Sequence, residues 1–224
     1  RDEGGSSTVG IESAGTYYVR VQGYAYWDVT EPPYQVSVSY SSATGGVELE
    51  PNNSTGQANP LALDATVEGQ LWSSLDNDYY AVTVEAAGTL TVQFDTAERH
   101  EYGWTFSILD ASGNTLGSVL CASTTCRDEG GSLTVGIESA GTYYVRVIGD
   151  PSWSTPTNAY LVSASYSSTT GGIELEPNGT RAEAQSLAFD TTVVGQLSSY
   201  TDNDYYAVTV EAAGTLTVQF DTAE

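Results

Sequence analysis

Basic residues are scarce in this 224-residue chain, which has no lysine, one histidine and 6 arginines against 29 acidic residues. The formal net charge is therefore -23. Such a field repels phosphate backbones and anionic lipid headgroups, so the composition argues against nucleic acid and membrane surfaces as partners. Cations are attracted instead, which makes a divalent metal the natural counterion.

Long hydrophobic runs are also missing. No stretch approaches the roughly 20 apolar residues that a membrane span needs, and no segment resembles a signal peptide. Yet 40% of the residues are hydrophobic and 11% are aromatic. That is enough for one large or two ordinary domains with their own cores, and it rules out a disordered chain.

The chain repeats itself at an offset of 126 residues. Shifting residues 1–98 onto 127–224 needs no gap and gives about 70 identities in 98 pairs. A period of this length matches an independent domain of roughly 100 to 150 residues rather than a solenoid repeat. Ser/Thr/Gly clusters precede Val47 and Ile173 and suggest the boundaries. We therefore expect a window on a longer repetitive chain, with the end of one repeat at 1–47, a complete repeat at 48–173 and the start of another at 174–224.

Period-two alternation predicts a β protein. In one segment Tyr80, Val82 and Val84 alternate with Ala81 and Thr83, as in a half-buried strand. Similar segments begin at Leu90, Trp104, Leu133, Tyr143 and Tyr160, and Val67–Leu71 is a further candidate. Three intervening turn sequences place Gly88, Gly113 and Gly141 where a positive φ is expected. The pattern predicts tandem all-β domains, each an antiparallel, jelly-roll-like sandwich, with weak helical character only at Thr180–Ser186.

Cysteine is limited to Cys121 and Cys126, which bracket a short loop. We expect a disulfide between them, which would stabilise the fold by roughly 2 kcal/mol in the chain-entropy model and would imply an oxidising compartment. A free pair in a reducing cell and a metal pair are the alternatives. A zinc site is short of ligands because the chain has only one histidine.

Acidic and amide side chains recur where the complete repeat begins and where one of its strands begins. Glu48, Glu50 and Asn52 alternate and project to one side of an extended segment, while Asp76 and Asp78 share a face about 25 residues later. Carboxylates brought together without a cation repel one another. Calcium accepts 6 to 8 oxygen ligands in irregular geometry and would resolve that conflict. Alternatively, these are solvated strand ends that never meet.

The order of these motifs resembles the bacterial pre-peptidase C-terminal domain. The resemblance rests on E-x-E-P-N-N from Glu48, G-x-L from Gly69, D-x-D-Y-Y from Asp76, L-D-x-x-G-N from Leu109 and G-T-Y-Y-V-R-V from Gly141. It implies a calcium-binding β sandwich of secreted bacterial proteins. The calcium ligands that it implies in the complete repeat are Glu48, Glu50, Asn52, Asn53, Asp76 and Asp78. Those implied in the following repeat are Glu174, Glu176, Asn178, Asp202 and Asp204, with Gly179 standing where Asn53 stands in the first set.

No catalytic constellation accompanies these residues. The one histidine, His100, sits in a polar sequence typical of a hairpin tip, and no G-x-S-x-G elbow is present. We therefore expect a protein that is not an enzyme but an extracellular or cell-surface stalk, adhesin or filament of calcium-stiffened sandwiches. Its expected partners are other copies of itself and neighbouring repeats, with Tyr18 and Tyr144 as candidate contacts. The alternative is an accessory domain of a secreted enzyme that binds collagen, a polysaccharide or another surface ligand.

Overall fold

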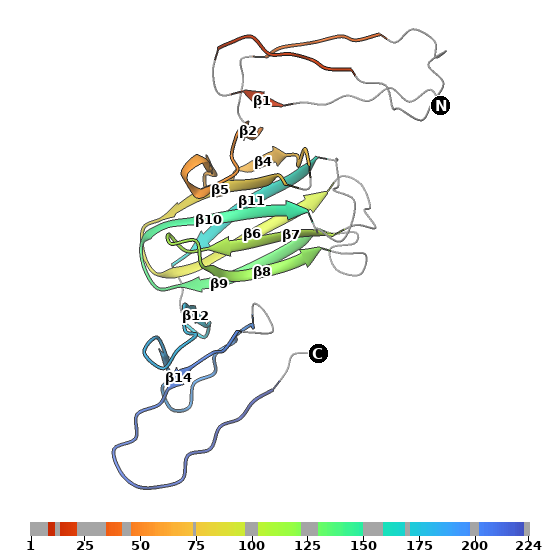
Figure 1. Ribbon diagram of the computed structural model, residues 1–224. Coiled ribbons are helices and arrows are strands. Elements are labelled where there is room, and N and C mark those ends of the chain that lie inside the picture. Colours follow the sequence, from red (N-terminus) through yellow and green to blue (C-terminus); the bar gives the residue numbers. More distant parts are fainter. Residues whose placement is uncertain are drawn as a thin grey trace.

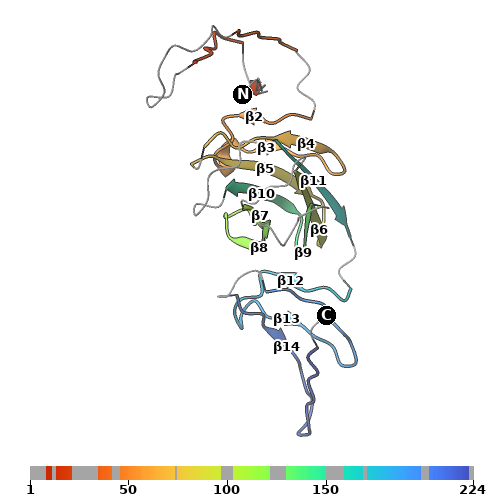
Figure 2. The same cartoon turned by 90° about the vertical axis from the view of Figure 1, so that its right-hand side faces the viewer.

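A computed structural model of the chain describes residues 9–11, 14–21, 35–41, 46–73, 75–96, 103–121, 130–149, 159–168, 171–197 and 202–221. The middle of the chain forms a sandwich of two sheets, which Figure 2 shows as two layers. No helix in the described residues has the length and apolar character needed to cross a bilayer. The all-β sandwich expected from the alternation pattern is confirmed for this part of the chain.

Each layer of the sandwich is a sheet of 5 strands. The first sheet runs in the order β3 (Asn59–Pro60), β5 (Asn77–Val84), β10 (Gly141–Gly149), β7 (Trp104–Leu109) and β8 (Thr115–Cys121). The second runs in the order β12 (Leu175–Glu176), β9 (Gly131–Ile137), β6 (Gly88–Thr96), β11 (Tyr160–Ser167) and β4 (Thr66–Gly69). Neighbouring strands are antiparallel except at β3 with β5 and at β12 with β9.

The apolar residues of the alternating segments fill the space between the layers. Tyr80, Val82 and Val84 of β5 are buried, as are Leu90, Val92 and Phe94 of β6. Aromatic rings close one end of this core, where Phe94 stacks on Tyr160 at a centroid distance of 5.2 Å and Trp104 meets the Tyr160 ring edge-on at 5.4 Å. The predicted strand at Val67–Leu71 is present as β4, which begins one residue and ends two residues earlier.

The positive φ predicted for the three turn glycines is found at one of them and is wrong for the other two. Gly113 has a φ of +85° in the turn that Asp110 caps, as expected. Gly88 and Gly141 do not adopt a positive φ. At Gly88 the requirement is space, because a Cβ would lie 2.2 Å from the backbone oxygen of Ser167.

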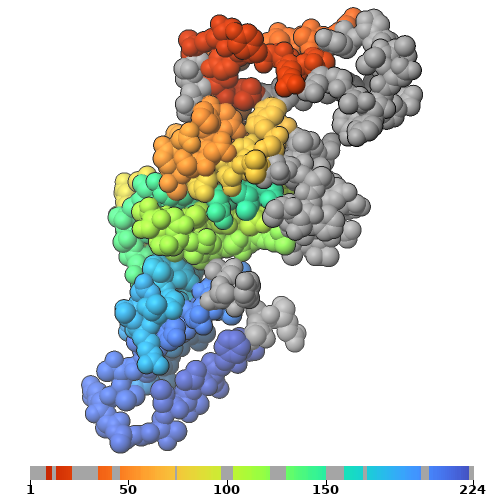
Figure 3. Space-filling model, in the orientation of Figure 1, coloured from red at the N-terminus to blue at the C-terminus, as the bar shows by residue number. Residues whose placement is uncertain are grey.

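The described residues among 9–41 and those among 174–221 lie at opposite ends of the central sandwich (Figures 1 and 3). The remaining elements are short: β1 (Gly10–Ile11), β2 (Leu49–Glu50), η1 (Thr55–Gln57), β13 (Gln185–Ser186) and β14 (Tyr206–Ala207). The weak helix expected at Thr180–Ser186 is wrong, because this segment forms turns and then strand β13, whose Gln185 pairs with Tyr206.

Candidate metal centre

The central sandwich and the segment that leads into it, residues 46–53, are called the central unit below, and the residues from 172 onward are called the following unit. The leading segment is fixed to the sandwich by backbone and side-chain hydrogen bonds. The Glu48 N–H donates to the Glu68 carbonyl at 2.9 Å, and the Glu68 N–H donates to the Gly46 carbonyl at 2.7 Å. The side chain of Asn59 accepts from the Leu49 N–H and donates to the Leu49 carbonyl. These contacts hold Glu48 against the open end of β4 and β5, where its side chain is 4% exposed.

Glu48 is the hub of the acidic cluster. Its Oε1 accepts from the Gln70 N–H at 2.6 Å. Its Oε2 accepts from the Tyr80 hydroxyl at 2.8 Å and from Asn52 Nδ2 at 3.4 Å. Burial raises the pKa of the Glu48 carboxyl, while the Gln70, Tyr80, Asp78 and Asn52 hydrogen bonds oppose the shift.

Glu50 and Asp78 bring two more carboxyls to the same place. Carboxylate oxygens of Glu48, Glu50 and Asp78 all lie within 4.8 Å of one another. Asp78 is fully buried, and one of its oxygens accepts from the Tyr160 hydroxyl. Burial, reinforced by the Glu48 charge, raises the pKa of Asp78 to about 9. Burial and the Asp76 charge raise the pKa of Glu50 to about 7.

Three buried oxygens in this cluster receive no hydrogen bond from the residues that the structure describes: Oε1 of Glu50, Oδ1 of Asn52 and Oδ1 of Asp78. Buried polar atoms are normally satisfied, so each unsatisfied one calls for an explanation. All three are acceptors, which is what a bound cation requires. Hard carboxylate and amide oxygens without nitrogen or sulfur suit calcium or magnesium. The residues present therefore fit a hard divalent cation, and calcium is one of the ions that such a donor set can hold.

Two of the expected ligands lie outside this group. Asn53 is exposed, and its Oδ1 accepts from the Asn77 N–H at 3.1 Å. Asp76 uses Oδ2 to accept from the Trp72 N–H at 2.6 Å, and its carboxylate is not among those that converge within 4.8 Å. Both hold backbone at the rim of the cluster. Both also line a groove of about 730 Å³ that reaches Glu50 from outside.

The following unit repeats the arrangement. Glu174 Oε1 accepts from Asn178 Nδ2 at 2.7 Å and from the Tyr206 hydroxyl at 3.1 Å, and its Oε2 accepts from the Gln196 N–H at 2.7 Å. The Asn178 N–H donates to Glu176 at 2.9 Å, as the Asn52 N–H donates to Glu50 at 3.1 Å. Each contact involves the residue 126 positions after its counterpart in the central unit.

The same three positions are unsatisfied in both clusters. In the second they are Oε1 of Glu176, Oδ1 of Asn178 and Oδ1 of Asp204. Carboxylate oxygens of Glu174, Glu176 and Asp204 lie within 4.8 Å of one another, and Asp202 is outside that group, like Asp76. Burial raises the pKa of both Glu176 and Asp204 to about 7. Because Asn53 is not a cluster member, Gly179 at its equivalent removes a rim contact rather than an oxygen of the centre.

Sequence reasoning missed the tyrosines. Tyr80 and Tyr160 are buried, their hydroxyls lie 2.7 Å apart, and each donates to a carboxylate of the cluster. Tyr80 could have been suspected, because it follows the Asp78 position by two residues and shares its face. No local signal points to Tyr160, which comes from β11, 82 residues after Asp78.

Two other features of the sequence cannot be compared with the structure. Cys121 is buried at the end of β8, but Cys126 lies outside the described residues, so the disulfide stays a prediction. His100 lies outside them as well.

Comparisons with known proteins agree with the resemblance. The model of the bacterial pre-peptidase C-terminal domain family matches residues 76–149. No curated protein sequence matches the chain.

Solved structures with a similar fold include the pre-peptidase C-terminal domain of a Bacillus anthracis collagenase, at a TM-score of 0.38 and 18% identity over 48% of this chain and 93% of that one. PliG of Aeromonas hydrophila, a periplasmic inhibitor of g-type lysozyme, matches at a TM-score of 0.37 and 14% identity over 49% of this chain and 97% of that one. CsCBM6-3 of Clostridium stercorarium, solved with cellobiose, matches at a TM-score of 0.25 and 16% identity over 42% of this chain and 67% of that one. Residues 76–149, in the central sandwich, therefore match the bacterial pre-peptidase C-terminal domain family.

Proposed function

We propose that the chain is part of a non-catalytic extracellular repeat protein whose β sandwiches each bind calcium and act as stiff units of a stalk, adhesin or filament. The observation behind this proposal is the recurrence of three unsatisfied buried oxygens at equivalent positions 126 residues apart. One such cluster could be a local accident. Two clusters with the same hydrogen-bond pattern indicate a feature that each repeat preserves.

Calcium would be held in the central unit by Glu48, Glu50, Asn52 and Asp78, and in the following unit by Glu174, Glu176, Asn178 and Asp204. The ion would supply positive charge to oxygens that now face one another without a donor. It would also connect the segment that begins each unit to the strand that carries Asp78 in the central unit or to the segment that carries Asp204 in the following unit. Each unit would then be closed by its own ion.

The repeat organisation is supported by apolar side chains in the two terminal parts. Val19 and Val36 are exposed near the N-terminus, whereas their counterparts Val145 and Val162 are fully buried. Phe220 is 88% exposed near the C-terminus, whereas its counterpart Phe94 is 2% exposed. The same residues thus occupy core positions where a full sandwich surrounds them. Tandem copies of one sandwich explain both environments.

Calorimetry on the whole chain tests the proposal. Calcium titrated into EDTA-stripped and dialysed protein should bind at two sites and raise the melting temperature of the central sandwich. A ligand that binds only the folded state at 100 times its Kd stabilises by about 2.7 kcal/mol. Magnesium at the same concentration should stabilise less, because it demands regular octahedral geometry. Absence of both heat and stabilisation with calcium would overturn the assignment.

Assembly and ligand binding need separate measurements. Concentration-dependent association with calcium, followed by sedimentation velocity, would support contacts between copies. A chain that stays monomeric at high concentration would count against a filament. Retention on immobilised collagen or cellulose would instead favour the accessory-domain alternative.

A further inference from the structure

The strand that begins each unit takes part in two units at once. In the following unit this leader strand is β12, and it pairs in parallel with β9 of the central sandwich, with Leu175 opposite Gly136 and Glu176 opposite Ile137. It is thereby the edge strand of the central unit's second sheet (Figure 2). Glu176 nevertheless belongs to the acidic cluster of its own unit. One short strand therefore connects a cation site to the neighbouring sheet.

The same junction occurs at the other end of the sandwich. There the leader strand of the central unit is β2, which pairs in parallel with β1, with Gly10 opposite Leu49 and Ile11 opposite Glu50. Each residue of the β1–β2 pairing lies 126 positions before the corresponding residue of the β9–β12 pairing. The two junctions thus have the same strand direction and the same register.

A glycine makes this close pairing possible. A Cβ on Gly136 would lie 1.9 Å from the Glu174 backbone oxygen, and one on Gly10 would lie 1.8 Å from the Glu48 backbone oxygen. Neither glycine adopts a positive φ, so backbone conformation does not require it. What requires it is the approach of the next unit's backbone, which leaves no room for any side chain.

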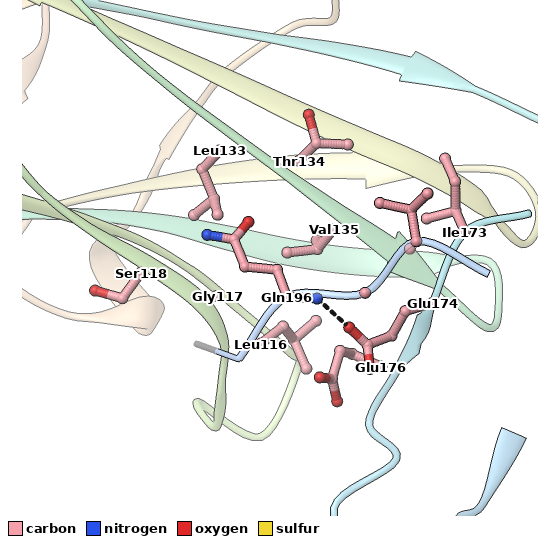
Figure 4. A pocket seen from close by; sticks show the side chains of 13 residues that line it. Leu116, Gly117, Ser118, Leu133, Thr134, Val135, Ile173, Glu174, Glu176 and Gln196 are labelled. Atoms are coloured by element: carbon pink, nitrogen blue, oxygen red, sulfur yellow. Dashed lines mark hydrogen bonds between the residues drawn. The ribbon is translucent and has the colours of Figure 1, made fainter. Parts of the chain in front are cut away.

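Apolar surface accompanies the pairing. A cavity of about 310 Å³ lies beside it, lined by Leu133 and Val135 of the central unit and by Ile173 and Val194 of the following unit. Figure 4 shows Leu133, Val135 and Ile173 together with Glu174 and Glu176, which also line the cavity. The junction therefore has an apolar part, a backbone pairing and the acidic cluster side by side.

We propose that the β9 edge of each sandwich is a docking site for the leader strand of the next sandwich, and that cation binding in the leader's own unit strengthens this docking. The cation part rests on the proposed function; the docking part does not. Without a cation, the carboxylates of Glu174, Glu176 and Asp204 repel one another at the base of the leader strand. A cation removes this repulsion and orders the strand before it pairs, so less entropy is lost on docking. The angle between successive units then becomes fixed only when the site is filled.

Hydrogen exchange on the whole chain tests both parts. Peptides covering residues 46–51 and 172–177 differ by one residue, Val47 against Ile173, so mass spectrometry can follow the two junctions separately. In the wild-type chain we expect both peptides to exchange more slowly in calcium than in EDTA. In Gly136→Ala only the second junction should lose protection, while its calcium site remains present with an affinity lowered by about 5-fold or more, since coupling is reciprocal.

Two variants keep the test independent of folding. Gly10→Ala should deprotect only the first junction and leaves every strand of the central core unchanged. Gly141→Ala is the matched control, because a Cβ there meets nothing within 4 Å, and it should change neither junction. Full protection of residues 172–177 in Gly136→Ala would overturn the docking site. Tight calcium binding with equal protection in calcium and EDTA would overturn the coupling and leave calcium binding standing, whereas protected junctions without calcium binding would overturn the proposed function and leave docking standing.

Discussion

At the scale of single residues, the acidic cluster is defined by how few hydrogen-bond donors face its carboxylates. Tyr80 and Tyr160 each have one hydroxyl proton, and these go to Glu48 and Asp78. The Asn52 amide adds a bond to Glu48. Within the described part of the chain, none of the three unsatisfied oxygens has a hydrogen-bond partner. Glu50 and Asp78 each have one oxygen that accepts a hydrogen bond and one left for a cation, and the single side-chain oxygen of Asn52 is left as well.

Replacing Asp78 by Asn should separate metal affinity from folding. The shape is kept, but one buried negative charge is lost, so calcium affinity should fall by at least about tenfold because ligand charge sets it. The unfolding temperature in EDTA should stay or rise, since repulsion with Glu48 is relieved. Titration calorimetry and thermal unfolding measure the two effects. Glu68→Gln, an exposed carboxylate on β4, is the control that should change neither. Unchanged affinity in Asp78→Asn would remove Asp78 from the site.

Removing the hydroxyl of Tyr160 should destabilise the sandwich itself. Tyr160→Phe leaves an oxygen of buried Asp78 without its donor, which costs about 1 to 3 kcal/mol. Denaturant unfolding in EDTA measures the loss. Tyr79→Phe on β5, where the ring is only half-buried, is the comparison and should cost less. Equal stabilities of the two variants would show that the hydroxyl of Tyr160 contributes nothing.

At the scale of elements, the leader strand of the central unit is held to its own sandwich by a side-chain amide, Asn59, where a neighbouring strand would use backbone hydrogen bonds. Asn59 both accepts from and donates to the backbone of Leu49. Gln185 in the following unit also makes two backbone contacts, accepting from the Leu175 N–H at 2.9 Å and donating to the Ile173 carbonyl at 3.0 Å. The residue and the accepting carbonyl both differ, yet a carboxamide contacts the leader strand at two points in each unit. The leader strand therefore depends on a carboxamide at this position.

Asn59→Asp should loosen the leader strand of the central unit. The variant loses the donor to the Leu49 carbonyl and sets a carboxylate against that oxygen, which costs about 1 to 3 kcal/mol at a buried site. Residues 46–51 should exchange faster and calcium affinity at that unit should fall. Asn59→Gln imitates the following unit and should retain most of both. An Asp variant that matches the wild-type chain in exchange would show that the carboxamide is not needed.

At the scale of the whole molecule, repulsion between the many negative charges destabilises the folded state unless cations are present. The net charge is -23, and each described unit buries part of it in a cluster. Successive units are joined through strands that also belong to these clusters. Stability, stiffness and cation concentration are therefore expected to change together.

The metal-free chain should lose stability as the pH rises from 5 to 8. The folded-state pKa is about 7 for Glu50 and Glu176 and about 9 for Asp78, whereas unfolded carboxyls titrate near pH ~4. Between these values the folded state binds more protons than the unfolded state, so stability falls with pH. Thermal unfolding in EDTA should show a lower melting temperature at pH 8, and saturating calcium should remove most of the difference.

Salt distinguishes the buried clusters from general surface repulsion. Potassium chloride at high concentration screens exposed charges strongly and buried ones weakly. The pH effect should therefore persist in high salt and shrink in Asp78→Asn. A melting temperature in EDTA that rises from pH 5 to pH 8 would contradict the shifts assigned to these carboxyls.

The linear sequence by itself determined the β architecture, because alternation at Tyr80–Val84 and its equivalents can bury one face only as strands. It also determined that Glu48 and Glu50 recur with Asp78 at matching spacing in two copies. Tertiary structure alone decided that Asp76 binds backbone while Asp78 enters the cluster, and that Tyr160 completes it from another strand. It also decided that each leader strand pairs with the sheet before it. The physical reason is that strand neighbours are chosen by core packing between distant segments, whereas local patterns record only which face of each strand is buried.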